Sequence, residues 1–191
     1  MPNYVRRYAP GGTFFFTVVT HRRRPVFSSS RGRSFLHAAI QHVRREHRFD
    51  LVATVLLPDH WHCVWTLPRD DCDYSKRLGL IKSCFSKLWL SAGEREVTVS
   101  AARAERRERG IWQRRFWEHT IRDEEDFIRH VNYIHYNPVK HGLTRCPHLW
   151  PHSSFRRWTE EGYYREDWLC DCEGRRQIVP DNLREGSTFG E

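Results

Sequence analysis

Apolar and polar positions follow two periods along this chain, and the change from one period to the other separates expected strands from expected helices. Runs rich in aromatic and β-branched residues predict four strands, at residues 13–20, 49–57, 60–67 and 111–121. Apolar residues at helical spacing predict three helices, at residues 34–47, 74–90 and 123–137. The elements therefore alternate as strand, helix, strand, strand, helix, strand, helix.

The first six elements match an α+β fold of the ferredoxin-like (RRM-like) kind, an antiparallel sheet with helices on one face. The seventh adds a C-terminal helix, which we expect to end near Asn137 because Pro138 disfavours a helical residue before it. Ser34 is the candidate N-cap of the first helix. Pro58 and Asp59 form a turn, so the third strand is the returning arm of a hairpin.

Residues 91–110 interrupt the apolar pattern, because they are dense in Arg, Glu and Ala and hold few large apolar side chains. We expect a solvated insertion there that is helical in part, with modest support from Glu and Arg three and four positions apart. Beyond Gly142 the chain becomes loop-rich. We therefore expect one domain over residues 1–158, followed by a C-terminal tail over residues 159–191.

The 191-residue chain carries 32 Lys and Arg against 24 Asp and Glu, a formal net charge of +8. Only 4 of the basic residues are Lys. The planar fork of Arg suits phosphates and base edges, so the charge favours a polyanionic partner, although genomic base composition alone also produces Arg-rich chains. No apolar run reaches the length of a membrane span and the first residues form no signal region, so we expect a cytoplasmic protein.

Six cysteines stand at positions 63, 72, 84, 146, 170 and 172, with no CxxC pair and no repeated spacing. Cys63 and Cys84 lie among apolar residues and are interpreted as small buried hydrophobes. Cys170 and Cys172 are candidate zinc ligands, but no partner pair lies near them in the sequence, so we expect no zinc site there. Reduced thiols are the expectation for a chain without a secretory leader.

His60 and His62 flank Trp61 at the start of the third predicted strand. Positions i and i+2 of a strand share a face, so both imidazoles point the same way and the indole points the other way. Neutral imidazole is the commonest protein ligand for transition metals, and the pair is half of a metal site. On its own, the same spacing is also typical of an exposed strand face.

A nucleophile and a third ligand are available in the last predicted helix. Tyr133 and Asn137 are four residues apart, so they lie on one face of its final turn. A tyrosine hydroxyl can attack phosphorus where a metal neutralises the phosphate, and an amide oxygen is a suitable ligand for Mg²⁺ or Mn²⁺ beside two imidazoles. The alternatives are structural: Tyr133 and Tyr136 as half-buried helix aromatics, and Asn137 before Pro138 as an ordinary helix end.

Two motifs together make the pattern specific: His60-Trp61-His62 and Tyr133-Ile-His-Tyr-Asn137-Pro-Val-Lys-His-Gly142. They resemble the HUH single-tyrosine transposases, and most closely the subgroup associated with repetitive extragenic palindromes (REP). The resemblance covers most of residues 4–158. Its other matching stretches are, in chain order, Tyr4-Val-Arg-Arg-Tyr8, Gly11-Gly12-Thr13, Leu57-Pro58-Asp59, Trp65-Thr-Leu-Pro68, Trp112-Gln-Arg-Arg-Phe-Trp-Glu-His119 and Trp150-Pro-His-Ser-Ser154.

This resemblance implies that His60 and His62 are paired metal ligands, Asn137 the third ligand and Tyr133 the nucleophile. It further implies a divalent metal, Mg²⁺ or Mn²⁺, and cleavage and rejoining of single-stranded DNA through a 5′-phosphotyrosine without ATP. The implied substrates are REP-type imperfect hairpins flanked by a short guide sequence, and the implied state is a nucleoid-associated monomer. Two features depart from compact members: the insertion at 91–110, and a competing hydroxyl at Tyr136.

The expected DNA surface consists of basic residues, several in adjacent pairs: Arg6, Arg7, Arg22, Arg23, Arg114, Arg115, Lys140, Arg156 and Arg157. Any one of them taken alone is more often merely a solvated surface charge, but as a group they fit the net charge. A second reading of the whole chain is a non-catalytic single-stranded nucleic-acid-binding module or a domesticated regulator. A module of that RRM-like kind would expose stacking aromatics on its central strands, a pattern that the sequence does not show.

Overall fold

A computed structural model describes residues 9–106, 108–172, 179–183 and 189. Its centre is one antiparallel sheet of four strands in the order β2-β3-β1-β4. The bounds are Thr13–Val19 for β1, Asp50–Leu56 for β2, His60–Thr66 for β3 and Trp117–Thr120 for β4. This order and the antiparallel pairing confirm the predicted ferredoxin-like fold.

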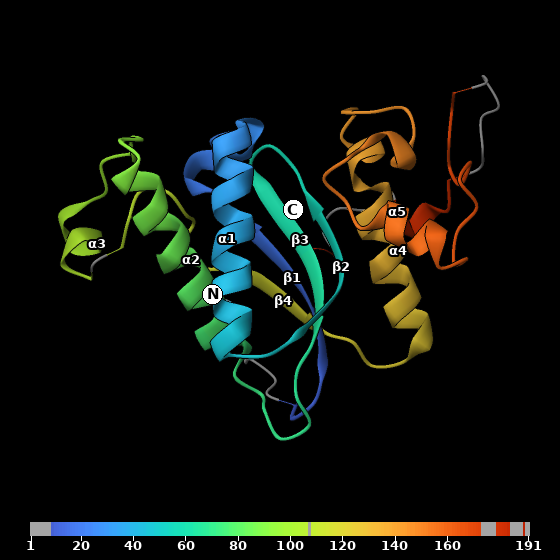
Figure 1. Ribbon diagram of the computed structural model, residues 1–191, viewed down its shortest axis with the longest axis horizontal. Helices are drawn as coiled ribbons and strands as arrows, with labels where there is room; N and C mark the ends of the chain where they lie inside the picture. Colours follow the sequence, from blue (N-terminus) through green and yellow to red (C-terminus); the bar gives the residue numbers. More distant parts are fainter. Residues whose placement is uncertain (1–8, 107, 173–178, 184–188, 190–191) are drawn as a thin grey trace.

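Helices cover both faces of the sheet, as Figure 1 shows. On one side lie α1 (Ser30–Glu46) and α2 (Tyr74–Ser91), and on the other lies α4 (Glu124–Lys140), the additional helix expected after the fourth strand. Two further helices are short. Helix α3 (Ala101–Glu105) lies in the expected insertion, and α5 (Phe155–Glu160) follows α4. Four 3₁₀ turns complete the described structure: His21–Arg23, Val26–Ser28, Pro147–Leu149 and Asp181–Leu183.

The pleat of the sheet divides the buried residues into two cores. The core between the sheet and α1/α2, called here the α1/α2 core, takes Phe14, Phe16, Trp61 and Trp65. The core between the sheet and α4, called here the α4 core, takes the intervening positions, among them Phe15 and Val64. Alternation along β1 and β3 thus assigns each side chain to one core or the other.

The predicted start of the first helix was wrong. Helix α1 begins at Ser30, and the side chain of Ser29, rather than Ser34, accepts a hydrogen bond from the backbone N–H of Gly32 at 3.0 Å. The first turn is polar and contains Gly32, so apolar periodicity starts only later. A Cβ at Gly32 would collide with the carbonyl oxygen of Val26, so tertiary packing sets this turn.

The predicted end of α4 was also wrong, since the helix continues through Pro138 to Lys140. A proline in the last turn removes only one hydrogen bond, and the chain still closes the helix through His141 N–H to the Asn137 carbonyl at 3.0 Å. Gly142 then leaves the helix with φ +66°. The helix is therefore one turn longer, with Asn137 inside it instead of at its end.

The strand predicted over 111–121 is shorter than expected, because only Trp117–Thr120 pairs continuously with β1. Trp112 makes a single isolated bridge to Thr20, and its indole enters the α1/α2 core together with Ile111. Aromatic residues there reflect burial and not strand pairing.

Several of the described residues beyond α4 pack against the rest of the chain. Segment 152–154 runs along the free edge of β2, with hydrogen bonds from Leu56 N–H to the His152 carbonyl and from Ser154 N–H to the Thr54 carbonyl. Leu169, Leu183 and Phe189 enter the α4 core. Among the described residues, no helix is long and apolar enough to cross a membrane.

Candidate active site

His60 and His62 lie on β3 and belong to the face of the sheet that α4 covers. Both are buried, with 1% and 0% of their surface exposed, so they are not an exposed strand face. Their ring centroids are 4.8 Å apart. The intervening Trp61 packs in the α1/α2 core on the opposite side, as alternation requires.

Hydrogen bonds at Nδ1 orient both rings. Nδ1 of His60 lies 2.6 Å from Oδ1 of Asp59, and Nδ1 of His62 lies 2.9 Å from Oγ1 of Thr17, its register partner on β1. The Thr17 hydroxyl donates its own hydrogen to the Phe189 carbonyl at 2.6 Å, so it accepts from His62. Each ring therefore carries its proton on Nδ1, and Nε2 is the nitrogen that can coordinate a metal.

Asp59 keeps a negative charge beside this pair. Burial opposes its ionisation, but the hydrogen bonds from His60 and Arg23 and the positive charge of Arg23 outweigh burial and lower the pKa of the Asp59 carboxyl. Arg23 contributes an ion pair of 3.1 Å to Oδ2. A carboxylate that orients an imidazole and raises its basicity is a usual support for a metal-binding histidine.

Tyr133 projects from α4 against the same pair. Its ring centroid lies 5.4 Å from that of His62, and its side chain is fully buried. The ammonium of Lys140, two turns further along α4, donates a hydrogen bond to the Tyr133 hydroxyl at 3.2 Å. A positive charge at this position stabilises negative charge on the phenolic oxygen.

Asn137 lies between two contacts that fix the position of α4 along β3. Tyr133 lies beside His62, and the ring of His141 lies 5.3 Å from that of His60. Asn137 is four residues from Tyr133 and four from His141, the C-cap of α4, and it is fully buried, on the side of the helix that faces the histidines. Two imidazoles and an amide oxygen fit a divalent cation, so the donor set is suitable for one.

Tyr136, the competing hydroxyl, is only half-buried and packs at the border of the α4 core. It is three residues after Tyr133, whereas the rings that lie against the histidines belong to residues 133 and 141, eight positions apart. The geometry therefore brings Tyr133, and not Tyr136, next to His62.

Sequence reasoning missed Phe189. Its ring stacks on that of Tyr133 with centroids 3.6 Å apart and planes 10° apart, and it also contacts His130. Nothing local in a polar C-terminal stretch signals such a contact, because it links residues far apart in the sequence. Because Tyr133 is fully buried, a DNA phosphate can reach its hydroxyl only if part of the packing around it moves.

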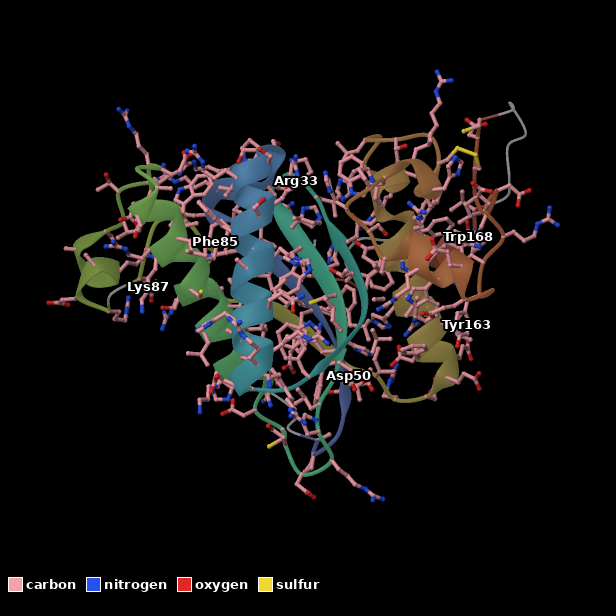
Figure 2. The ribbon with its side chains drawn as sticks, in the orientation of Figure 1. Arg33, Asp50, Phe85, Lys87, Tyr163 and Trp168 are labelled. Carbon is pink, nitrogen blue, oxygen red and sulfur yellow. A yellow bond between two sulfur atoms is a disulfide. The ribbon has the colours of Figure 1, made fainter. Side chains whose placement is uncertain are left out.

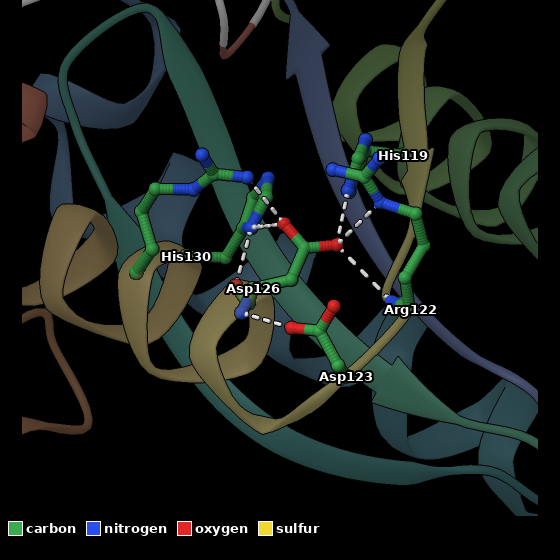
Figure 3. Close-up of polar contacts among 6 residues, drawn as sticks. His119, Arg122, Asp123, Asp126 and His130 are labelled. Carbon is green, nitrogen blue, oxygen red and sulfur yellow. Dashed lines mark hydrogen bonds and ion pairs between the residues drawn. The ribbon is translucent and has the colours of Figure 1, made fainter.

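A second polar cluster lies beside the site and holds α4 on the sheet (Figure 3). Asp126 of α4 accepts hydrogen bonds from His119 of β4 at 2.7 Å and from Arg129 at 2.6 Å. Burial opposes its charge, but these hydrogen bonds and one from Arg122 lower its pKa well below the usual range. His130 stacks on His119 with centroids 4.4 Å apart. Since the carboxylate is already engaged by two guanidinium groups, the cluster is an ion-pair network rather than a metal centre.

Buried histidines of α4 are neutral at pH 7. Burial lowers the pKa of His130 to about 4 against the opposing hydrogen bond to the Asp126 carbonyl, and burial with the charge of Arg157 lowers the pKa of His135 to about 3. Nε2 of His135 lies 2.8 Å from the Ser154 hydroxyl, which joins α4 to the edge segment 152–154. These residues position the helix that carries Tyr133.

The candidate DNA-binding residues are scattered over the surface. Arg6 and Arg7 lie outside the described residues. Arg22 and Arg115 are exposed, whereas the others make ion pairs or hydrogen bonds: Arg23 with Asp59, Arg114 with Glu108, Arg156 with Glu160, Arg157 with the Leu51 and Val52 carbonyls, and Lys140 with Tyr133. Among the candidates that the structure describes, these contacts bring Arg23 and Lys140 next to the histidine–tyrosine site.

Comparison with known proteins assigns the chain to a family. A sequence model described as "Transposase IS200 like" matches residues 12–137, a range that contains both histidines, Tyr133 and Asn137. The chain is also 40% identical over 171 residues to the REP-associated tyrosine transposase of Escherichia coli, covering 90% of this chain and 93% of that protein. The chain belongs to the IS200-like transposase family.

Further relatives agree with this assignment. A putative REP-associated tyrosine transposase of Haemophilus influenzae is 40% identical over 168 residues, covering 88% of this chain and 93% of that protein. A solved structure of a REP-associated tyrosine transposase bound to a REP hairpin superposes with a TM-score of 0.74 at 38% identity, covering 94% of this chain and 100% of that one. The resemblance inferred from the sequence is confirmed, and transposases of this family are generally metal-dependent.

Proposed function

We propose that this transposase cuts and rejoins single-stranded DNA at REP-type hairpins, with Tyr133 as the nucleophile that forms a 5′-phosphotyrosine. The observation that carries the proposal is the meeting of α4 and β3, where the Tyr133 ring lies 5.4 Å from His62 and its hydroxyl lies 3.2 Å from the Lys140 ammonium. The side chains come from strands and a helix far apart in the sequence, and family membership supplies the reaction class.

In the proposed reaction, the Tyr133 oxygen loses its proton to solvent and attacks the scissile phosphorus. A new P–O bond forms to the tyrosine, and the bond from phosphorus to the 3′ oxygen breaks. That oxygen takes up a proton and becomes a 3′-hydroxyl. Attack by a 3′-hydroxyl on the phosphotyrosine restores the tyrosine, and because one phosphodiester bond is exchanged for another, no ATP is required.

The residues around Tyr133 have separate roles in this proposal. Lys140 stabilises charge on the phenolic oxygen, and Asp59 and Thr17 hold the two imidazoles with Nε2 directed to the coordinating side. Mg²⁺ or Mn²⁺ held by His60, His62 and Asn137 would neutralise phosphate charge and hold the scissile bond.

The substrate class follows from the relatives. The similar solved structure is of a transposase bound to a REP hairpin, and we extend that substrate to this chain. Its net charge of +8 suits a nucleic acid, and the proposed contacts to DNA phosphates are Arg6, Arg7, Arg22, Arg23, Arg114, Arg115, Lys140, Arg156 and Arg157. A monomer acting in the cytoplasm on nucleoid DNA is part of the same proposal.

The alternative of an RRM-like binding module conflicts with the packing. Such modules stack bases on aromatic side chains of an open sheet face. Here α1 and α2 cover one face and α4 the other, and Phe15 and Trp65 of the central strands are fully buried. Base stacking on an open sheet face is therefore not available to this chain.

The test is a covalent-adduct assay with labelled single-stranded hairpin DNA and Mn²⁺ or Mg²⁺, resolved on a denaturing protein gel. The proposal expects a shifted protein–DNA band with the wild type and with the matched control Tyr136→Phe, and none with Tyr133→Phe or after chelation. An adduct with Tyr133→Phe would refute the nucleophile. Hairpin binding without any adduct, unchanged by His60→Ala with His62→Ala, would instead favour the non-catalytic reading.

A further inference from the structure

Four side chains of zinc-binding type gather away from the active site, where the loop after α4 meets the C-terminal segment. Cys146 and His148 come from the sequence Cys-Pro-His at the 3₁₀ turn Pro147–Leu149, and Cys170 and Cys172 come from Cys-Asp-Cys. One ligand atom from each lies within 4.8 Å of the other three. The two segments are also joined by a hydrogen bond from the Asp171 N–H to the Arg145 carbonyl at 3.4 Å.

We propose that these four residues form a structural Zn²⁺ site of the Cys₃His type. Tetrahedral zinc binds thiolate at about 2.3 Å and imidazole at about 2.0–2.1 Å, which places the ligand atoms about 3.5–4 Å apart. No two ligand atoms are therefore more than about 1 Å too far apart, and the sulfurs of Cys146 and Cys170, which are bonded to each other, would move apart after reduction. The sequence-based expectation of no zinc site was based on the lack of a nearby partner pair. The fold supplies that partner from 24 residues earlier in the chain.

His148 provides an independent indication of a ligand. In the part of the chain that the structure describes, its Nδ1 atom is buried and meets no hydrogen-bond partner. A buried ring nitrogen without a partner is costly, and a metal ion within the cluster removes that cost. The backbone N–H of Cys172 also donates to Sγ of Cys170 at 3.4 Å, a contact that supports negative charge on a coordinating sulfur.

The structure holds Cys146 and Cys170 as a disulfide, drawn in yellow near the C-terminal segment in Figure 2. A disulfide explains two of the four residues, but neither His148 nor Cys172. The zinc site belongs to the reduced chain: a dithiol reductant converts the bond to two thiols and is itself oxidised to a disulfide. Zinc then replaces the protons of three thiols, which are released to solvent.

The proposed zinc site does not depend on the active-site chemistry. Its position indicates that it cross-links two segments of the chain. It joins the loop that follows α4 to the segment carrying Leu169, whose side chain is anchored in the α4 core. By contrast, Cys63 is buried in a strand, where burial raises the pKa of its thiol well above the ordinary value, and Cys72 and Cys84 lie outside the cluster. These cysteines serve as internal controls.

The test counts zinc bound to the purified, reduced full-length chain by mass spectrometry of the metal. It is done in a His60→Ala, His62→Ala background, so that zinc at the active-site histidines does not contribute. We expect about one zinc per chain, retained by the matched control Cys72→Ser. Less than about a tenth of that amount should remain in Cys172→Ser and in Cys146→Ser.

Cys172→Ser is the decisive variant because the residue is exposed and takes no part in the disulfide. Circular dichroism establishes that it folds, and Co²⁺ substitution gives a second measurement, since thiolate-to-cobalt charge-transfer absorption should be strong in Cys72→Ser and lost in Cys172→Ser. A reduced chain without zinc, or a Cys172→Ser chain that keeps the full amount, would overturn the proposal. Loss of zinc only after mutation of Cys72 would do the same.

Discussion

The two faces of the sheet are buried to a similar extent but are built from different chemistry. On the α1/α2 side, Phe16 and Trp65 pack among other aromatic and aliphatic side chains. On the α4 side, the neighbouring strand positions are Thr17, His60 and His62, and α4 places Tyr133 against them. One face is a hydrophobic core with little polar content, and the other is a core that contains a polar site.

This difference shows how a single strand contributes both to a hydrophobic core and to a polar site. Trp61 and His62 are neighbours in the sequence, yet the pleat sends the indole into the α1/α2 core and the imidazole toward Tyr133. A shift of one residue in register would move every side chain of the strand to the opposite face. The buried aromatic residues of the α1/α2 face therefore also fix the positions of the histidines on the α4 face. The α1/α2 side should therefore govern stability, and the α4 side chemistry.

The largest expected contrast is between Phe16→Ala and His62→Ala. Removing a fully buried phenyl ring should lower the free energy of unfolding by about 3–5 kcal/mol while the molecules that remain folded keep their cleavage rate. Loss of His62 should instead reduce the single-turnover cleavage rate by about 10³-fold with a much smaller effect on stability. Denaturant unfolding and cleavage assays at low temperature check both. Near-normal cleavage by His62→Ala would remove the distinction between the faces.

Asp59→Asn should weaken the dependence on metal without removing the ligands. The carboxylate lies 2.6 Å from Nδ1 of His60, and losing its charge should raise the metal concentration needed for half-maximal cleavage by about 10–100-fold. The control Asp50→Asn, an exposed position at the start of β2, should leave it unchanged. Equal behaviour of the two variants would mean that Asp59 does not support a metal ligand.

Acid should destabilise the α4 side through its buried histidines. The pKa of His135 is about 3 in the folded chain against an ordinary 6.5, so between these values the unfolded chain binds more protons and stability falls as the pH drops below about 6.5. From pH 7 to pH 5 the wild type should lose about 2 kcal/mol more than His135→Gln, a factor of about 30 in the unfolding equilibrium. Denaturant unfolding at both pH values measures this. The exposed His42→Gln should behave as wild type, and an equal pH dependence in His135→Gln would contradict the assignment.

The smallest expected effect concerns access to Tyr133. Because the Phe189 ring stacks on it at 3.6 Å, Phe189→Ala should open the tyrosine and increase the rate of adduct formation by about 10-fold. Leu183→Ala, which removes another buried side chain of the same C-terminal region but does not stack on Tyr133, is the matched control. A rate that is unchanged in Phe189→Ala would show that this contact does not limit access.

Much of this architecture follows from local pattern. Alternation and turn residues predict the hairpin that presents His60 and His62, and spacing predicts that Tyr133 and Asn137 share a face. Errors occur where tertiary packing overrides local preference: Pro138 is accommodated inside α4, and Gly32 lies in a helical turn that the apolar pattern does not mark.

Contacts between distant segments are the part that local pattern cannot supply. Cys146 and His148 meet Cys170 and Cys172 only because the chain returns after α5, and Phe189 reaches Tyr133 across the α4 core. The Thr17 hydroxyl that supports His62 depends on strand register, which hydrophobic alternation limits but does not fix. These are the residues for which the structure adds most to the sequence.

We propose that the α4 face carries the chemistry through Tyr133. The most direct test is to digest the covalent protein–DNA adduct and locate the attached nucleotide by tandem mass spectrometry. We expect a phosphodiester-linked nucleotide on Tyr133 in the peptide from α4, with Tyr136 of the same peptide unmodified. A nucleotide on Tyr136, or on any residue outside α4, would contradict it.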